Sequence, residues 1–135
     1  MCTFETRCKL IANQQNLMNK LITPLFFLLV ACGTPLPQLD GIDLEKWKGD
    51  KNGCQGERLR FLGALQSQHE KLKGLSQDDI VKLLGRPDKN ELYKRNQKFF
   101  FYALTPGKAC GSANETQQLS IRFNAMGLAK EVIIE

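Results

Sequence analysis

An apolar run near the start of the chain, residues 21–31, limits what the rest of the sequence can fold into. It is eleven residues long, contains Pro24 and follows Lys20. This length is typical of the hydrophobic region of a signal peptide, and it is shorter than the roughly 17–25 residues that a membrane-spanning helix needs. A buried helix or strand of a cytoplasmic protein is the alternative, since short apolar runs fit either structure. We expect the run to be removed, so that the folded protein lies downstream.

The last three residues of this run together with the next one, Leu29-Val30-Ala31-Cys32, resemble the lipobox of bacterial lipoproteins. In those proteins a lipid is attached to the cysteine, and cleavage then makes the cysteine the mature N-terminus. The resemblance implies lipidation of Cys32 and anchoring of the chain to a bacterial membrane. Gly33, rather than an acidic residue, follows the cysteine. By resemblance to enterobacterial sorting this implies the outer membrane, with the domain in the periplasm or at the cell surface.

The sequence divides into three predicted parts. Residues 1–31 are the leader and signal peptide, with Met18 as the expected translation start because the polar segment before it is longer than a usual n-region. A genuine extended leader from Met1 is the alternative. Residues 32–41 contain prolines and glycines without periodicity, which predicts a flexible tether. Residues 42–135 are predicted to form a single domain.

The composition of the predicted mature chain excludes one class of partner. The whole chain of 135 residues has 19 basic and 14 acidic residues, of which Arg7, Lys9, Lys20 and Glu5 lie in the removed part. The remainder therefore carries a formal charge of about +3. Because this charge is small, and no basic run is interleaved with aromatic residues, we expect no nucleic-acid binding.

Two cysteines remain after the predicted processing, because Cys2 and Cys8 lie in the leader and Cys32 would carry the lipid. In an oxidising compartment the remaining pair, Cys54 and Cys110, is predicted to form a disulfide. Two unpaired thiols and a metal site are the alternatives, although two cysteines without a nearby histidine are a weak zinc signature. We expect the bond to join the start of the first helix to a loop between strands.

Two helices are predicted before the sheet. Over residues 57–73 apolar side chains recur every three to four positions, which indicates a helix with one buried face and with Arg58 on its solvent side. Ser76 is predicted to cap a second, shorter helix that ends at Gly85. Ahead of both, Trp47 is expected in a short turn that packs onto the domain.

Further along the chain the pattern changes from helical to alternating, which predicts an antiparallel sheet. Residues 91–94 and 98–104 are predicted to pair as a hairpin. A loop over 107–116 and two more strands, at 119–123 and 128–134, follow.

Four consecutive aromatic residues, Phe99-Phe100-Phe101-Tyr102, lie in the second strand of the predicted hairpin. Alternation places Phe99 and Phe101 on one face of the sheet, and Phe100 and Tyr102 on the other. Two short helices can cover only one face. Either an exposed aromatic patch is a partner site, or the termini and loops cover it. We take Phe100 and Tyr102 as the candidate partner surface.

The order of helices and strands resembles the SmpA/OmlA (BamE-like) family of outer-membrane assembly lipoproteins. The resemblance rests on Gly74-Leu75-Ser76, on Leu84-Gly85-Arg86-Pro87 and on residues 119–124, and it covers roughly residues 74–134. It implies an α+β fold in which two N-terminal helices pack on one face of a three- to four-stranded antiparallel sheet. It also implies a lipoprotein that binds protein or envelope partners.

The same unit is similar to the repeat of beta-lactamase inhibitor proteins, so the fold alone does not select a function. Two features differ from the BamE-like pattern: the predicted helix over 57–73 is longer, and the pair Cys54 and Cys110 is additional. An inhibitor-like module, or a module of the periplasm or cell surface that binds a small ligand or lipid, is therefore the alternative function.

The sequence carries no recognisable catalytic constellation. The single histidine, His69, lies among leucines on a predicted helix, where a structural role is expected. Asp78 and Asp79 are adjacent near a helix start, so capping is favoured over paired-carboxylate catalysis. No nucleophile elbow, phosphate-binding glycine loop or zinc-protease motif is present. We therefore predict a protein that is not an enzyme, with no cofactor and no metal.

Overall fold

Residues 35–135 are described by the computed structural model. The predicted start at Met18, the apolar run at 21–31 and the lipidation site Cys32 lie outside these residues, as do the two leader cysteines. Within the described part, Leu36–Glu135 forms one unit.

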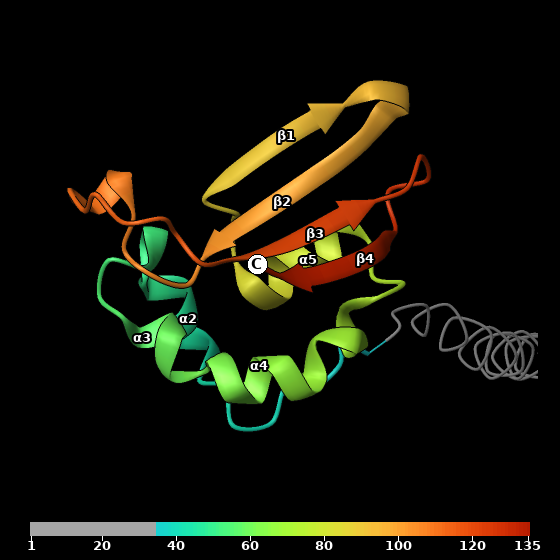
Figure 1. The fold of residues 1–135 in the computed structure, drawn as a ribbon. Helices are drawn as coiled ribbons and strands as arrows, with labels where there is room; N and C mark the ends of the chain where they lie inside the picture. The colour runs from blue at the N-terminus through green and yellow to red at the C-terminus, as the bar shows by residue number, and fades with distance from the viewer. Residues whose placement is uncertain (1–34) are drawn as a thin grey trace, which may run out of the picture. The chain divides into compact units, whose positions relative to one another are not determined.

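A four-stranded antiparallel sheet forms the second half of this unit, with the strands in chain order. The strands are β1 (Lys89–Tyr93), β2 (Gln97–Ala103), β3 (Gln118–Phe123) and β4 (Ala129–Ile134). Short connections join β1 to β2 and β3 to β4, whereas a long loop joins β2 to β3 (Figure 1). The predicted α+β class with an antiparallel sheet is confirmed.

Helices and short helical turns precede and connect the strands. The helices are α2 (Leu44–Gly49), α3 (Glu57–Arg60), α4 (Leu62–Gln68) and α5 (Gln77–Leu84); the 3-10 turns are η2 (Lys51–Gly53), η3 (His69–Leu72), η4 (Lys94–Asn96) and η5 (Lys108–Cys110). Figure 1 shows α5 behind the sheet, with α2, α3 and α4 along its lower edge. The front of the sheet is open in this view.

The predicted continuous helix over residues 57–73 is wrong, because the structure divides it. Phe61 has φ −90° and ψ 3°, which ends α3 before α4 begins, and the last turn is the 3-10 segment η3. The break changes which side chains share a face. Leu59, expected in the apolar stripe, is 41% exposed, whereas Arg58, expected in solvent, is only 1% exposed.

Helix α5 begins and ends where the sequence predicts. The Ser76 hydroxyl oxygen accepts a hydrogen bond from the Asp79 amide (3.2 Å), and the same hydroxyl donates to an Asp79 carboxylate oxygen (2.7 Å). The hydrogen bond from Ser76 lowers the pKa of Asp79. At the other end, Gly85 has φ 82°, a conformation that favours glycine and ends the helix.

The hydrophobic core lies on one face of the sheet. Its members on β2 and β3 alternate along the strand, β4 contributes Ala129 and Val132, and all of them join side chains from the helices in one cluster. The fully buried members are Trp47, Leu65, Leu72, Ile80, Leu84, Tyr102, Leu104, Leu119, Ile121 and Phe123. The expected packing of Trp47 onto the domain is confirmed.

The last part of the predicted tether is bound to the domain instead of being free. Leu39 is buried in the core. The backbone of Asp40 exchanges two hydrogen bonds with the Gln68 side chain (2.8 and 2.7 Å), and the Lys71 ammonium donates to the Gln38 carbonyl (3.1 Å). The sequence did not predict this attachment, because a single leucine among prolines and glycines forms no hydrophobic periodicity that would indicate burial. The folded unit therefore starts before residue 42.

Two glycines of the helical part give a matched test of local backbone geometry. Gly53 has φ 65°, and a Cβ there would lie 3.0 Å from the Ala103 carbonyl oxygen, whereas a Cβ on Gly63 in α4 would meet no atom within 4 Å. We expect Gly63→Ala to stabilise the fold by about 0.5–1 kcal/mol. Gly53→Ala is expected to destabilise it by about 1–3 kcal/mol, because the alanine is strained and crowded. Urea unfolding measures both changes; a neutral Gly53→Ala would contradict the described packing.

Candidate functional site

The candidate surface residues Phe100 and Tyr102 are buried, so the prediction of a partner surface at these two positions is wrong. Phe100 is 4% exposed and Tyr102 is fully buried. The Phe100 ring packs edge-on against Phe123 with ring centroids 4.7 Å apart, and Tyr102 lies 6.4 Å from Trp47. Both side chains point to the face that the helices cover, and this places them in the core.

The opposite face of the sheet carries the other aromatic residues of the run. The rings of Phe99 and Phe101 are stacked, with centroids 6.1 Å apart and 9° between their planes. Tyr93 of β1, which is 63% exposed, contacts Phe99 edge-on at 6.1 Å. We call this surface the outer face; its members on the four strands include Lys89, Tyr93, Phe99, Phe101, Ala103, Gln118, Arg122 and Ile133.

The outer face continues beyond the aromatic rings to the other edge of the sheet. Arg122 of β3 donates to the Glu131 carboxylate at 2.7 Å, and the neighbouring Ile133 is 43% exposed. At the β1 edge, Lys89 forms an ion pair with Glu91 and lies over the Phe101 ring at 5.7 Å. The face therefore has an aromatic centre and charged margins.

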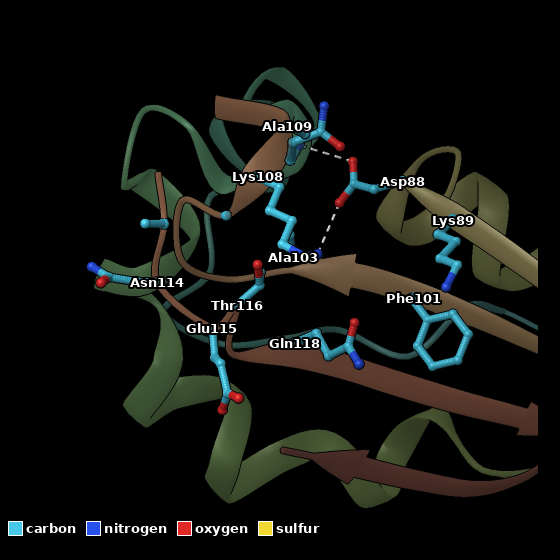
Figure 2. A pocket seen from close by; sticks show the side chains of 13 residues that line it. Asp88, Lys89, Phe101, Ala103, Lys108, Ala109, Asn114, Glu115, Thr116 and Gln118 are labelled. Carbon is cyan, nitrogen blue, oxygen red and sulfur yellow. Dashed lines mark hydrogen bonds between the residues drawn. The ribbon is translucent and has the colours of Figure 1, made fainter. Parts of the chain in front are cut away.

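One end of the outer face is hollowed into a pocket of about 580 Å³. Figure 2 shows it between the ends of β1, β2 and β3 and the loop that connects β2 to β3. Most of its lining residues have polar side chains, although apolar atoms contribute most of the exposed lining surface; the residues include Asn52, Asp88, Lys89, Phe101, Ala103, Lys108, Ala109, Asn114, Glu115, Thr116 and Gln118. The pocket thus extends the aromatic surface and adds polar groups to it.

The loop that walls this pocket is fastened to the helical layer. Cys54 and Cys110 form a disulfide, with their Cα atoms 5.5 Å apart. Gly107, on the same loop, lies so close to Thr116 that a Cβ there would be 1.8 Å from the Thr116 hydroxyl oxygen. The Thr105 hydroxyl oxygen accepts from the Gln117 amide at 2.8 Å. These contacts fix the position of the wall relative to β2.

A buried ion pair lies at the base of the pocket, where its carboxylate, Asp88, belongs to the lining. One guanidinium nitrogen of Arg58 donates to the Asp88 carboxylate and to the Ala103 carbonyl oxygen (3.1 Å). Asp88 also accepts the backbone amides of Asn52 (3.0 Å) and Ala103 (2.8 Å). This one carboxylate therefore joins η2, α3 and β2.

A second buried carboxylate, that of Asp50, orients the chain around Arg58. Its two oxygens accept the backbone amides of Gln55 (2.8 Å) and Arg58 (2.9 Å). The Arg58 guanidinium donates from Nε to the Trp47 carbonyl oxygen at 3.0 Å, and it lies 5.2 Å from the Trp47 ring and 5.8 Å from the Tyr102 ring. We call Arg58, Asp50 and Asp88 the buried charge cluster. These three positions have no regular spacing in the sequence, so the hydrophobic and charge periodicity could not predict that they meet.

Tyr102 closes the cluster and supplies a pH test. Burial raises the pKa of its phenol, with the nearby Arg58 charge acting in the opposite direction, and its hydroxyl donates to the Gly85 carbonyl oxygen at 2.8 Å. Because the pKa is raised in the folded state, its contribution to stability is complete below the unfolded pKa of about 10. That contribution is lost as the pH rises above this value towards the folded pKa.

The titration can be observed directly in a variant with one tyrosine. The chain has two tyrosines, so Tyr93→Phe leaves only Tyr102. We expect its phenolate absorbance to stay absent in the folded protein at pH 10 and to appear near that pH in denaturant. A native titration midpoint equal to the denatured one would contradict the burial of this phenol.

The single histidine, His69, which was considered as a catalytic residue, has structural contacts. The His69 ring is half-buried, with Nδ1 2.8 Å from the Gln66 carbonyl oxygen and Nε2 3.2 Å from the Glu70 carboxylate.

Within residues 35–135, no cluster of three or more His, Cys, Asp or Glu side chains could hold a metal ion. In that same part of the chain, no helix has the length and apolar character needed to cross a membrane.

No family model, curated protein or solved structure matches this chain.

Proposed function

We propose that this chain is a non-catalytic lipoprotein of the bacterial cell envelope, anchored through lipid on Cys32, whose α+β domain binds a protein partner through the outer face. This is a BamE-like role, with the docking surface on Phe99 and Phe101 instead of Phe100 and Tyr102. The observation that carries the proposal is the outer face itself, where stacked aromatic rings lie on a sheet surface that carries no helix within the described residues.

Anchoring is supported by the order of features in the sequence. The short apolar run is followed by small Ala31 and then Cys32, as in a lipobox. Each buried methylene of an attached lipid contributes about 0.8 kcal/mol, so two or more chains hold a protein on a membrane where one chain does not. The bonded pair Cys54 and Cys110 supports export, because disulfides persist in oxidising compartments.

The BamE-like part of the proposal is supported by the arrangement of elements. Helices precede an antiparallel sheet, and the apolar side chains of α4, η3 and α5 share one cluster with the inner residues of the strands. We include in the proposal the finer description of this family, in which two N-terminal helices pack on one face of the sheet. That packing leaves the other face for a partner.

A protein partner fits the outer face better than a small ligand does. Aromatic side chains are enriched in the central parts of protein interfaces, and the charged margins match a polar rim. Tyr93, Phe99 and Phe101 form a continuous row across β1 and β2. A partner that packs on this row would bury the exposed Tyr93 ring and the exposed parts of the half-buried Phe99 and Phe101 rings.

Site-specific photo-crosslinking tests the surface. A photoreactive phenylalanine analogue placed at Tyr93 or Ile133 of the full chain, expressed in its host, should give a discrete crosslinked product in the membrane fraction. The matched control is Leu59, an exposed apolar residue of α3 outside the outer face. Adding Phe101→Glu should reduce the product. Crosslinking of the same species from Leu59, or none from Tyr93 and Ile133, would overturn the surface assignment.

The anchor requires a separate test. Cys32→Ser should move the protein from the membrane fraction to the soluble fraction and remove the lipid mass from the mature N-terminus. A variant that stays membrane-bound with an unmodified residue 32 would contradict lipid anchoring and leave the surface proposal to be judged alone.

A further inference from the structure

The pocket and the outer face are continuous. Lys89, Phe101, Ala103 and Gln118 belong to the outer face and also line the pocket. A chain lying along the aromatic row would therefore reach the pocket at Phe101. The floor below is held by the buried charge cluster, and the wall is held by the disulfide. The pocket is thus built on ordered elements.

Two basic and two acidic side chains line this pocket, and their ion pairs decide which charges remain free. Lys89 and Lys108 line it, whereas Glu115 is its only acidic member besides Asp88. Asp88 is already neutralised by Arg58 and accepts two backbone amides. Figure 2 shows Lys108 running toward Ala103, while Glu115 points away from it.

The two lysines differ in their availability. Lys89 is paired with Glu91 at the rim, whereas Lys108 has no ion pair among residues 35–135. The Thr116 hydroxyl is a further hydrogen-bond donor in the lining, and the Gln118 amide, which already donates one hydrogen to the Glu135 carboxylate at 3.3 Å, keeps a second N–H. A carboxylate near Lys108 would therefore find both a positive charge and neutral donors, which is the combination that makes hydrogen bonds to a charged group strong.

We infer that this pocket receives an acidic side chain of the protein partner, with its carboxylate at Lys108 and its methylene stem against Phe101. This inference rests on the proposed docking at the outer face and specifies the chemistry of the docked segment. A glutamate fits a cavity of this size together with part of its backbone, and Phe101 supplies the apolar wall that the stem needs. The partner is thus an acidic segment that crosses the aromatic row and ends at the pocket.

Nuclear magnetic resonance of the purified full chain tests the pocket without the partner. The probe is N-acetyl-glutamate amide, and its neutral match is N-acetyl-glutamine amide. The acidic probe should shift the amide resonances of Ala103, Thr116 and Gln118. The neutral probe should bind about tenfold more weakly or worse, because it lacks the charge-assisted hydrogen bond. Equal binding of the two probes, or shifts outside the pocket only, would overturn the inference.

Two further titrations and two variants complete the design. Stronger shifts from inorganic phosphate, or from a neutral sugar such as N-acetylglucosamine, would assign the pocket to another ligand and overturn the inference. Lys108→Met should weaken the acidic probe about tenfold. The control is Lys130→Met, because Lys130 is exposed on β4 and does not line the pocket. This variant should leave the affinity for the acidic probe unchanged.

The probe experiment and the crosslinking experiment fail independently. If the acidic probe binds at Lys108 but Tyr93 and Ile133 give no crosslink, the outer face is not the docking surface and the pocket alone remains. If crosslinking succeeds but the acidic probe does not bind, the outer face remains and the acidic specificity is wrong.

Discussion

Replacing Arg58 by methionine is expected to lower the free energy of unfolding by about 3–5 kcal/mol, because it leaves the buried Asp88 carboxylate without its counterion. The substitution also removes donors from the carbonyl oxygens of Trp47 and Ala103. Methionine has a comparable length and can fill the space between the Trp47 and Tyr102 rings. The loss of stability therefore measures the charge and the hydrogen bonds of Arg58 more than its volume. Chemical denaturation followed by tryptophan fluorescence measures it, since Trp47 is the single tryptophan.

Arg60→Met is the matched control on the same helix. Arg60 is exposed and pairs with Glu57 at 3.3 Å, so its loss should change stability by less than about 1 kcal/mol. Arg58→Lys should recover only part of the stability, because an ammonium cannot reproduce the several hydrogen bonds of a guanidinium. Similar losses for Arg58→Met and Arg60→Met would show that the buried charge cluster does not stabilise the fold as described.

The second large effect is expected from the cysteine pair. Changing both Cys54 and Cys110 to alanine should lower the free energy of unfolding by about 2–4 kcal/mol. The two residues are 56 positions apart, and closing a loop of that length removes much of the entropy of the unfolded chain. Denaturation of the oxidised wild-type chain and of the double variant measures the difference.

Reductant separates the effect of the bond from that of the substitutions. It should lower the stability of the wild-type chain to about that of the double variant and leave the double variant unchanged. In the reduced chain the pocket wall at residues 107–116 should exchange its amide hydrogens faster than the β3 and β4 strands do, since fewer buried contacts hold it. An identical stability with and without reductant would mean that the thiols are not paired in the protein.

Local signals in the sequence predicted several elements correctly. Ser76 and Gly85 mark the two ends of α5 because capping and a positive φ depend on single residues. The alternating strands were also found, because the side chains of a strand point to opposite faces in turn. The hairpin and the last two strands differ from their predicted bounds by one to a few residues at the ends.

Contacts between distant segments were not predictable in the same way. Alternation divided the aromatic run into two pairs, but only the positions of the helices decide that Phe100 and Tyr102 are inside. Arg58 was expected in solvent because the periodicity of an amphipathic helix places charged residues on its solvent-exposed face. Its partners Asp50 and Asp88 come from a turn after α2 and from the segment before β1, and local periodicity carries no information about that meeting.

If the chain is anchored through Cys32 as proposed, the bound segment before α2 limits how far the domain can lie from the membrane. The folded unit begins at Leu36, four residues after Cys32, and such a stretch spans at most about 14 Å when fully extended. A domain of this length has a radius of gyration of about 13 Å, so an anchor at Cys32 would keep the outer face within a molecular diameter or so of the bilayer. Confinement to such a thin layer raises the effective concentration toward proteins of the same membrane. An interface too weak to persist in free solution would then be sufficient there.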